Sequence, residues 1–431
     1  MTGTVHIVGA GLAGLSAAVR LSENGRRIKI YEAAPQAGGR CRSYFDPVLQ
    51  RTIDNGNHLL LSGNASALDY LARIGAVHAL KGPEVAVFDF ADIRTGQRWT
   101  LRLDAGLFPR WVLDPDRRVP GSLLREYIAP IRLIGAGPSA RLSDVMNCSG
   151  PLYDRLWRPL LLAALNTEPA EASAQLAWQV LRRTIGAGGR ACLPLIAQYG
   201  LSAAFIDPAL EFLGRRNAEV LFGRMLRSID FGSGRAQALA FDQARVDLGS
   251  SDDVVLAVPP RAAATLLPGL ERPNAFSSIV NAHFAVAPPK GLPSILGIIG
   301  GVSHWLFAYE DRLSVTVSDA GHLLAQDRAE LANAIWREVA ILTGLPEQLP
   351  AWQIVKERRA TIRATPEQET TRPPQHTPWA NVVLAGDWTA TGLPGTIEGA
   401  IQSGYQAASL VAGQAPPRQP RLVRALEGSH G

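Results

Sequence analysis

Three glycines near the start of the chain carry the clearest chemical meaning. An apolar run at 5–8 leads into Gly9, Gly11 and Gly14, spaced as G-x-G-x-x-G, and apolar residues at helical spacing follow. In this pattern Gly9 allows a tight turn, Gly11 lets the backbone approach a pyrophosphate, and Gly14 lets the helix pack closely on the strand. The free N–H groups and positive dipole at the start of that helix attract phosphate. The spacing therefore predicts a site for a dinucleotide cofactor.

A carboxylate completes this pattern. Arg27–Tyr31 reads as a second strand, and Glu32 follows it at the place where an acid can accept hydrogen bonds from ribose hydroxyls. Leu12 and Ala13, in the first turn of the predicted helix, offer backbone amides to the phosphates. Strand, glycine turn, helix, second strand and acid in this order predict a Rossmann-like unit that uses these residues as cofactor contacts.

A second glycine turn favours FAD over NAD. Gly38, Gly39 and Arg40 follow Glu32 within a few residues. A Gly-Gly pair lets the backbone turn against a bulky ligand, and an arginine there can donate charge-assisted hydrogen bonds to a diphosphate. We therefore predict that Gly39 and Arg40 contact FAD.

A third turn, at the other end of the chain, supports the same interpretation. Gly386 and Asp387 follow a buried run at 382–385, and Ile397 and Glu398 stand at the start of a second predicted helix. That helix would offer its N–H groups to another part of the same extended cofactor. Turns of this kind at both ends predict an FAD-binding domain that is discontinuous in sequence. For Glu398, a plain helix-capping role is the alternative.

The bulk composition limits the class of protein. With 431 residues the chain is long enough for two domains, and it holds no apolar run long enough to predict a transmembrane helix. Its three cysteines form no C-x-x-C pair, which predicts a reducing, cytoplasmic compartment and no structural metal. The arginines behind the net charge of +5 are spread along the chain, so we expect no nucleic-acid partner. The oligomeric state stays open.

The order of predicted elements indicates a second domain with a mixed architecture. Period-two alternation around a glycine turn predicts an antiparallel hairpin at 84–103, where a substrate domain begins. Residues 108–200 read as mostly helical. Further strands are predicted within 218–260 and at 278–286, 295–309 and 313–318, and an amphipathic helix is predicted with Leu324, Leu331, Ile335, Val339 and Leu342 on one face.

These elements predict an α/β fold in two discontinuous domains. The Rossmann-like FAD-binding domain is expected to comprise 1–75, 200–268 and 378–413, and the mixed α+β substrate domain 76–199 and 269–377. The tail at 414–431, rich in Pro, Arg and Gln, is expected to be loosely ordered.

One segment carries two interpretations. Within 121–135 the apolar residues follow helical spacing, Arg125 and Arg132 point elsewhere, and Pro130 would kink or end a helix. A stretch just upstream, 107–118, is also rich in apolar residues and arginine. The first interpretation is a core-packing helix with a solvated face. The second is an interfacial patch, with apolar side chains in lipid and arginines on head groups.

With these motifs together, the chain resembles the flavin amine-oxidase superfamily and, within it, the squalene-associated FAD-dependent desaturases now described as hydroxysqualene dehydroxylases. The superfamily resemblance rests on Gly9–Leu15, Glu32, Gly38–Arg40 and Ala385–Asp387. The narrower one covers nearly the whole length and rests on Asp54–His58, Leu156–Leu160, Ala163–Thr167, Ser278–His283, Trp305–Phe307, Arg359–Thr361 and Pro394–Ala400. One departure is Glu168-Pro169, where that family has two prolines.

The resemblance implies an amine-oxidase/GDI-like architecture and a reductive reaction. FAD would remove the hydroxyl of hydroxysqualene, a C30 isoprenoid alcohol, giving squalene for hopanoid or sterol synthesis. Loss of water would leave an allylic-type carbocation, and the flavin N5 would deliver hydride to it.

Three alternatives stay open. Plant-type carotene desaturases share the Gly-Asp and Glu-Gly-Ala patterns near the C-terminus and are the nearest competitor. An amine oxidase is less favoured, because the strand that we align with its lysine-bearing strand, Ile279–His283, contains no lysine. A GDI-type lipid escort would use the same architecture without an active flavin.

The implied reaction needs an acid for the leaving oxygen. His58 is the first candidate because histidine titrates near neutral pH, and Asp54 could orient it or raise its pKa. A histidine held structurally beside the cofactor is the alternative. His283 and Asn281 are second candidates, with a role in strand packing as the alternative.

The remaining predicted contacts are apolar. Trp305 and Phe307 are expected to line a tunnel, with Asn281 as a further substrate contact, and an ordinary core role is the alternative for the two aromatic residues. Leu226 lies near the adenine in relatives. Since burial of hydrocarbon is favourable by roughly 25 cal/mol per Å², a C30 chain stays in a membrane unless a tunnel takes it over. We therefore expect a cytoplasmic protein, peripheral on the inner face of the cytoplasmic membrane.

Overall fold

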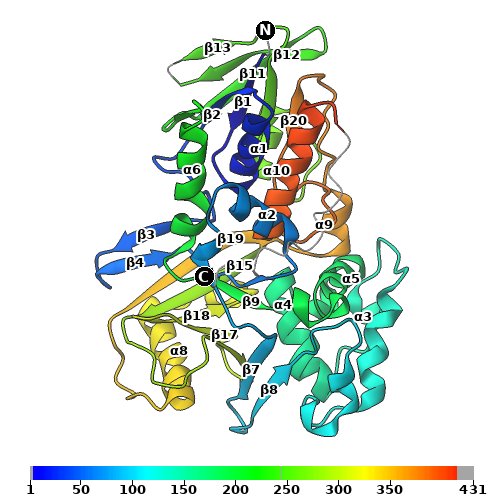
Figure 1. Ribbon diagram of the computed structural model, residues 1–431, viewed down its shortest axis with the longest axis vertical. Helices are drawn as coiled ribbons and strands as arrows, with labels where there is room; N and C mark the ends of the chain where they lie inside the picture. Colours follow the sequence, from blue (N-terminus) through cyan, green and yellow to red (C-terminus); the bar gives the residue numbers. More distant parts are fainter. Residues whose placement is uncertain (1–2, 243, 415–431) are drawn as a thin grey trace, which may run out of the picture.

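The computed structural model describes residues 3–242 and 244–414, and Figure 1 shows two parts stacked along its long axis. A parallel sheet flanked by the first and last long helices lies at the top, and a seven-stranded sheet with its own helices lies at the bottom. Apart from Gln414, the tail predicted at 414–431 lies outside the described residues.

The upper part is built on five parallel strands in the order β10-β2-β1-β14-β20. These strands are Glu219–Leu221 (β10), Arg27–Tyr31 (β2), Thr4–Val8 (β1), Asp253–Leu256 (β14) and Val382–Leu384 (β20). The apolar runs of β14 and β20 suit strands that are covered on both faces. The predicted parallel strand ending at Pro259 and Pro260 is confirmed, and Pro260 begins helix α7 (Pro260–Leu266).

The first and last long helices of the described residues pack together beside this sheet. Helix α1 (Leu12–Glu23) packs on helix α10 (Ile397–Val411), and a Cβ on Gly404 would lie only 2.1 Å from Ser16 Oγ. The Ser16 hydroxyl donates to the carbonyl of Ile401 at 3.3 Å, so the close approach also satisfies a buried polar group. Helices α2 (Ala65–Arg73) and α6 (Asp207–Gly214) flank the pair, as Figure 1 shows.

Three small sheets surround this core. The first is an antiparallel sheet at the top of Figure 1, formed by β11 (Leu226–Gly232), β12 (Arg235–Phe241) and β13 (Arg245–Asp247). The others are the hairpin of β3 (Ser43–Asp46) with β4 (Arg51–Asp54), and the short strands β5 (Leu60–Leu61), β9 (Pro194–Ala197) and β6 (Leu80–Lys81).

The lower part is built on seven strands in the order β19-β15-β18-β17-β16-β7-β8. They are Trp352–Ile362 (β19), Phe276–Phe284 (β15), Leu313–Val317 (β18), Trp305–Ala308 (β17), Ile295–Ile299 (β16), Val87–Asp92 (β7) and Arg98–Arg102 (β8). All neighbours are antiparallel except β7 and β16. The predicted hairpin at 84–103 is therefore confirmed as β7–β8.

Helical segments cover both faces of this sheet. Helix α8 (Arg328–Thr343) packs its apolar face on one side. The other side meets an apolar cluster that includes α4 (Arg158–Leu165), α5 (Ala174–Arg183) and the π-helical turn η5 (Tyr153–Trp157). The short helix α3 (Leu142–Val145) belongs to this layer, which agrees with the predicted helical character of 108–200. Helix α9 (Pro366–Thr370) lies beside α10 (Figure 1).

Three local predictions need correction. The stretch 295–309 forms two strands because Gly300, at φ +84°, turns the chain between them. Helix α8 begins after Asp327, whose carboxylate accepts hydrogen bonds from the first amides, so Leu324 lies outside it. The segment expected as one helix between 121 and 135 forms a 3₁₀ helix, η4 (Leu124–Leu133), that contains Pro130.

Candidate active site

The glycine turn after β1 leaves space only where a cofactor would lie. A Cβ on Gly9, at φ +107°, would meet the carbonyl oxygen of Ala257 at 2.3 Å, and one on Gly14 would meet that of Gly9 at 2.0 Å. A Cβ on Gly11 would meet nothing within 4 Å. Gly9 and Gly14 are therefore required by packing, whereas Gly11 borders open space at the N-terminus of α1, where Leu12 and Ala13 begin the helix.

Glu32 is held at the end of β2 by backbone amides. Its carboxylate accepts hydrogen bonds from the amide of Ala10 at 2.7 Å and from that of Ala34 at 2.8 Å. These bonds connect the glycine turn to the second strand. Leu226, the predicted adenine neighbour, is buried in the apolar cluster that also contains Tyr31, the residue before Glu32.

Motifs from opposite ends of the sequence meet at one ion pair. Arg40 Nη2 lies 2.6 Å from Asp387 Oδ1, across 347 positions of sequence. Asp387 is buried, while the Arg40 side chain is 50% exposed, so the guanidinium keeps a face open to a ligand. The Asp387 carboxylate raises the pKa of Arg40, which therefore stays charged. Next to it, Gly386 donates its amide to Ser403 Oγ at 2.7 Å.

Glu398 caps a helix, but not the helix that it belongs to. Its carboxylate accepts from the amides of Ser66 at 3.1 Å and Ala67 at 2.8 Å, at the start of α2. The start of α10 is capped instead by Thr396, whose hydroxyl accepts from the amide of Gly399. Glu398 and the adjacent Ile397 thereby connect α10 to α2, and a flavin contact of either residue stays a prediction.

His58 lies in the part of the molecule expected to hold the cofactor. It follows Asn57 in the loop after β4, is partly exposed, and interacts electrostatically with Arg40. Burial and then the Arg40 charge lower its pKa to about 4. The ring is therefore neutral at pH 7, which corrects the expectation of a histidine that titrates near neutrality.

Asp54 serves another part of the fold. Its buried carboxylate accepts from Ser43 Oγ at 2.6 Å and from the amide of Leu201 at 2.8 Å, and burial raises its pKa. Within 3–242 and 244–414, no hydrogen bond joins it to His58. Both hydrogen bonds end on Oδ1, and the pKa of His58 is lowered by burial and by Arg40 with no contribution from Asp54, so a role of Asp54 in orienting His58 stays a prediction.

His283 occupies the middle of the lower sheet. It is fully buried on β15, and its Nδ1 shares a hydrogen bond of 2.8 Å with Ser314 Oγ on β18. Burial lowers its pKa to about 3, with a smaller effect of the Arg312 charge. A neutral, packed imidazole of this kind favours the strand-packing alternative.

A buried polar cluster that sequence reasoning missed links the loop of His58 to the lower sheet. Thr316 Oγ1 donates to Asn281 Oδ1 at 2.7 Å, and Asn57 Nδ2 donates to Thr316 Oγ1 at 3.0 Å. The Tyr309 hydroxyl donates to Asn57 Oδ1 at 3.3 Å, and the Arg312 guanidinium lies 3.9 Å from the centroid of the Tyr309 ring. Asn57 belongs to the segment Asp54–His58 on which the family resemblance rests, but no spacing in the sequence links Asn57 to Tyr309 or Thr316.

Trp305 and Phe307 face the apolar cluster between the sheet and the helices. Both side chains of β17 are buried there with Tyr153, Trp157 and Tyr309. A cavity of about 310 Å³ reaches Trp305. Ligand pockets start at about 300 Å³. A second cavity, of about 390 Å³, shares Asp154 and Ile299 with it.

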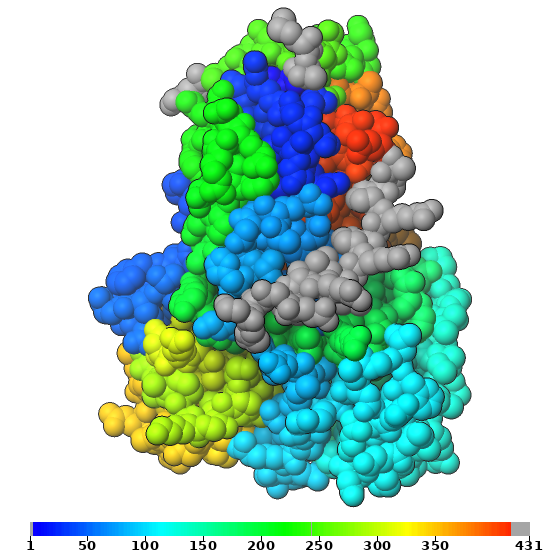
Figure 2. Space-filling model, viewed as in Figure 1, coloured from blue at the N-terminus to red at the C-terminus, as the bar shows by residue number. Residues whose placement is uncertain are grey.

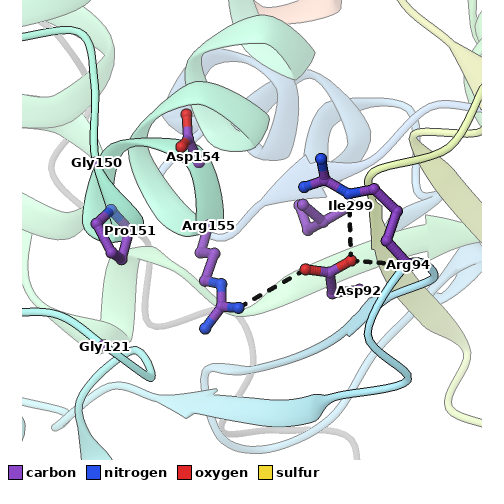
Figure 3. A pocket seen from close by; sticks show the side chains of 8 residues that line it. All are labelled: Asp92, Arg94, Gly121, Gly150, Pro151, Asp154, Arg155 and Ile299. Carbon is purple, nitrogen blue, oxygen red and sulfur yellow. Dashed lines mark hydrogen bonds and ion pairs between the residues drawn. The ribbon is translucent and has the colours of Figure 1, made fainter.

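Figure 3 shows this second cavity from close by. Arg155 points across it toward Asp92, at a distance of 3.7 Å between Arg155 Nη2 and Asp92 Oδ2, and Arg94 approaches the same carboxylate. Gly121 borders the opposite side. The two cavities therefore lie next to each other, one bordered by Gly121 and the other by Trp305.

The comparisons with known proteins agree with this geometry. The family described as flavin containing amine oxidoreductase matches residues 12–412, so the chain belongs to that family and is an FAD-dependent oxidoreductase. The open space at Gly11, the free amides of α1 and the accessible face of Arg40 fit FAD.

The relatives in sequence include hydroxysqualene dehydroxylase of Rhodopseudomonas palustris, 52% identical over 95% of this chain and 99% of that one. A probable zeta-carotene desaturase of Synechococcus elongatus is 24% identical over 94% and 97% of the two chains. Among solved structures, a double mutant of putrescine oxidase covers 96% of this chain and 99% of its own, with a TM-score of 0.69 and 17% identity, which supports the fold.

Two further structural findings concern metals and membranes. Within the part of the chain that the structure describes, no group of His, Cys, Asp and Glu side chains is arranged to hold a metal ion. In the same residues, no helix has the length and apolar character needed to cross a bilayer.

Proposed function

We propose that this chain removes the hydroxyl of hydroxysqualene reductively and releases squalene and water. The observation that carries this proposal is the 52% identity to a hydroxysqualene dehydroxylase over nearly the full length of both chains. The carotene desaturase, at 24%, is a far more distant relative. The absence of a lysine from β15 further disfavours amine oxidation.

The reaction balances with one proton and one hydride. The proton goes to the hydroxyl oxygen, the C–O bond breaks with loss of water, and a hydride closes the carbocation as a C–H bond. FAD, when bound and reduced, supplies that hydride. The residues of this chain must hold the substrate, deliver the proton and keep water from recapturing the cation.

The apolar cluster that contains Trp305 and Phe307 is suited to holding the substrate and to keeping water away from the cation. Trp305 and Phe307 are buried among apolar side chains, where water is excluded. The π faces of such rings attract a cation by about 2 kcal/mol or more when desolvated. We propose that these two residues, with Asn281 of the polar cluster, line the substrate site.

For the proton we propose His58 first, acting in its protonated imidazolium form. Its low pKa has two causes, burial and the Arg40 charge, and an anion on Arg40 would remove the second. His283 is second, limited by its full burial and its bond to Ser314. Asp54 would act only by holding the loop.

Tyr309 is a further candidate that one observation favours. Its hydroxyl reaches Asn57, the neighbour of His58, while its ring belongs to the apolar cluster of Trp305. Burial raises its pKa, so the phenol carries its proton at neutral pH. The adjacent Arg312 cation would stabilise the phenolate left after proton transfer.

We also propose the predicted domain boundaries and a location at the membrane. The upper and lower sheets draw on the segments predicted for the FAD-binding and substrate domains. A C30 hydrocarbon substrate resides in lipid. We therefore propose a cytoplasmic enzyme that works peripherally on the inner face of the cytoplasmic membrane.

Anaerobic single turnover tests the reaction. Purified holoenzyme is photoreduced and mixed with hydroxysqualene, and flavin absorbance and product mass are followed together. Flavin reoxidation matched by squalene is the expected result. Flavin that stays reduced with unchanged substrate would contradict the proposal. Reduction of oxidised enzyme by a carotene precursor would then favour the desaturase, and a colourless protein the escort.

A further inference from the structure

The segment from residue 107 to 134 exposes an unusual amount of apolar surface. Of the sixteen large apolar side chains that are exposed among the described residues, eight lie here. They are Leu107, Phe108, Leu113, Leu123, Leu124, Ile128, Ile131 and Ile134, and we call them the η2–η4 surface. The segment is part of the cyan region at the lower right of Figure 2, far from the parallel sheet at the top.

This surface belongs to a well-anchored unit. It spans the 3₁₀ helices η2 (Arg110–Leu113), η3 (Pro115–Arg117) and η4. On the inner side Trp111 and Leu133 are buried, and the Trp111 ring packs edge-on against Tyr127 at 5.2 Å between centroids. The Tyr127 hydroxyl accepts from the amide of Val119 at 2.9 Å. The apolar side chains are therefore presented outward by a fixed scaffold.

The charges around the surface are mostly positive. Five arginines and three acids lie between 107 and 134: Arg110, Arg117, Arg118, Arg125 and Arg132 against Asp114, Asp116 and Glu126. Arg110, Arg125 and Arg132 are exposed and have no ion pair among the described residues. Two of the acids are occupied locally, since Asp114 accepts from the amide of Asp116 and Glu126 from that of Leu123.

The η2–η4 surface also adjoins the two neighbouring cavities. Gly121, in the middle of the segment, lines the cavity of Figure 3, which shares the lining residues Asp154 and Ile299 with the cavity that reaches Trp305. An apolar substrate that leaves a bilayer at this surface would stand beside these two neighbouring cavities. No other concentration of exposed apolar side chains among the described residues has such a position.

We propose that the η2–η4 surface docks this enzyme on an anionic lipid bilayer, with its aliphatic side chains among the acyl chains and its free arginines on the head groups. The proposal rests on the proposed function, since it is the C30 substrate that requires access to lipid. It selects the second of the two interpretations of the 121–135 segment.

A second copy of this chain is a less favourable occupant. In a symmetric dimer the same patch faces itself. One positively charged surface would then face another, and like charges held close together cost free energy. Anionic lipid instead supplies the opposite charge.

Vesicle binding by the holoenzyme tests the surface without using turnover. The protein is centrifuged with phosphatidylcholine vesicles that contain or lack phosphatidylglycerol. We expect binding to the anionic vesicles. The double variant Ile128→Gln/Ile131→Gln should bind about tenfold or more weakly, since each isoleucine loses part of its transfer free energy to lipid. The double variant Arg125→Gln/Arg132→Gln should lose about fivefold per arginine at low salt and less at high salt.

A matched control separates this surface from apolar exposure in general. Val48 and Ile341 are 61% and 66% exposed, close to Ile131 and Ile128 at 61% and 63%, but lie on other parts of the molecule. The variant Val48→Gln/Ile341→Gln should bind vesicles like the wild type. Equal vesicle binding by the Ile128→Gln/Ile131→Gln and Val48→Gln/Ile341→Gln variants would overturn the proposal. So would a wild-type protein that does not bind anionic vesicles. A wild-type dimer that the Ile128→Gln/Ile131→Gln variant converts to monomer would assign the surface to self-association instead.

Turnover of detergent-dispersed hydroxysqualene keeps the two proposals apart. The η2–η4 variants should remain active in detergent and lose activity only with substrate in vesicles. If vesicle binding behaves as expected while the wild type never forms squalene, the proposed function fails and the docking surface stands.

Discussion

The upper and lower parts of the molecule recognise their ligands by different means. Around the parallel sheet, backbone groups do most of the work: glycines at 9, 11 and 14 shape a turn, and the amides of α1 face the open space. In the lower part, side chains from distant segments converge, as where Asn57, Asn281 and Tyr309 meet. A cofactor shared by a large family can be bound through main chain, whereas a particular substrate requires particular side chains.

The largest expected effect comes from the glycine turn. Gly14→Ala places a methyl group 2.0 Å from the carbonyl oxygen of Gly9, and we expect a loss of about 3 kcal/mol or more of folding free energy, with loss of bound flavin. Gly11→Ala meets no atom within 4 Å, so it should cost about 1 kcal/mol or less while weakening FAD binding. Thermal unfolding of the apoprotein and flavin absorbance separate the two. Equal destabilisation by both variants would break the distinction between packing and cofactor glycines.

The next effect concerns the polar side chains where the loop of His58 meets the lower sheet. His58→Ala should keep the yellow flavin and lose about a hundredfold or more of the single-turnover rate, as expected for removal of a general acid. Tyr309→Phe, which keeps the ring and its packing, is the matched variant for the second candidate. Full activity of His58→Ala combined with a large loss in Tyr309→Phe would transfer the role to Tyr309. Full activity of both would remove the two residues from the mechanism.

A smaller effect is expected at the ion pair where the two ends of the chain meet. Asp387→Asn leaves Arg40 without its partner and should raise the dissociation constant of FAD about tenfold. The loss is limited because Arg40 is half exposed. Asp242→Asn removes an ion pair of the same type at an exposed position and should leave FAD binding unchanged. Titration of apoprotein with FAD measures both, and unchanged binding by Asp387→Asn would contradict the assignment.

The last effect is a pH dependence of stability that originates in the lower sheet. Burial keeps His283 neutral in the folded protein, with a pKa of about 3, while the unfolded chain binds a proton below about pH 6.5. Acid therefore favours unfolding, and this histidine should remove about 1.4 kcal/mol per pH unit between pH 6 and pH 4. Urea unfolding of the wild type and His283→Gln at several pH values measures the difference in slope. Parallel slopes would show that His283 does not contribute.

Much of the upper part could be predicted because its constraints are local in sequence. A glycine turn between a strand and a helix has a fixed spacing, and so has the acid at Glu32. The ion pair of Arg40 and Asp387 also joins two motifs, each of which can be recognised in the sequence without the other. Less of the lower part could be predicted from the sequence, because the hydrogen-bond partner of a polar side chain depends on the fold.

Asp54, Glu398 and Ile128 illustrate what the sequence could not provide. Asp54 was expected to act on His58 and Glu398 to contact the flavin. In the structure the two carboxylates accept hydrogen bonds from the backbone amides of Leu201 and Ala67. The spacing around Ile128 fits a core-packing helix equally well, and only the packing of Trp111 and Tyr127 beneath it turns Ile128 outward. In each case the decisive contact is made by a residue that no local pattern identifies.

The contact of α1 with α10 has a consequence for how the enzyme is made. Ser16 and Ile401, which bond to each other across 385 positions, belong to the first and last helices of the described chain. Since a growing chain leaves the ribosome from its N-terminus, the glycine turn must wait for nearly the whole protein before α10 can support it. The cofactor site is therefore completed only late in synthesis, so a product that stops before α10 is expected to lack FAD and to be open to proteolysis.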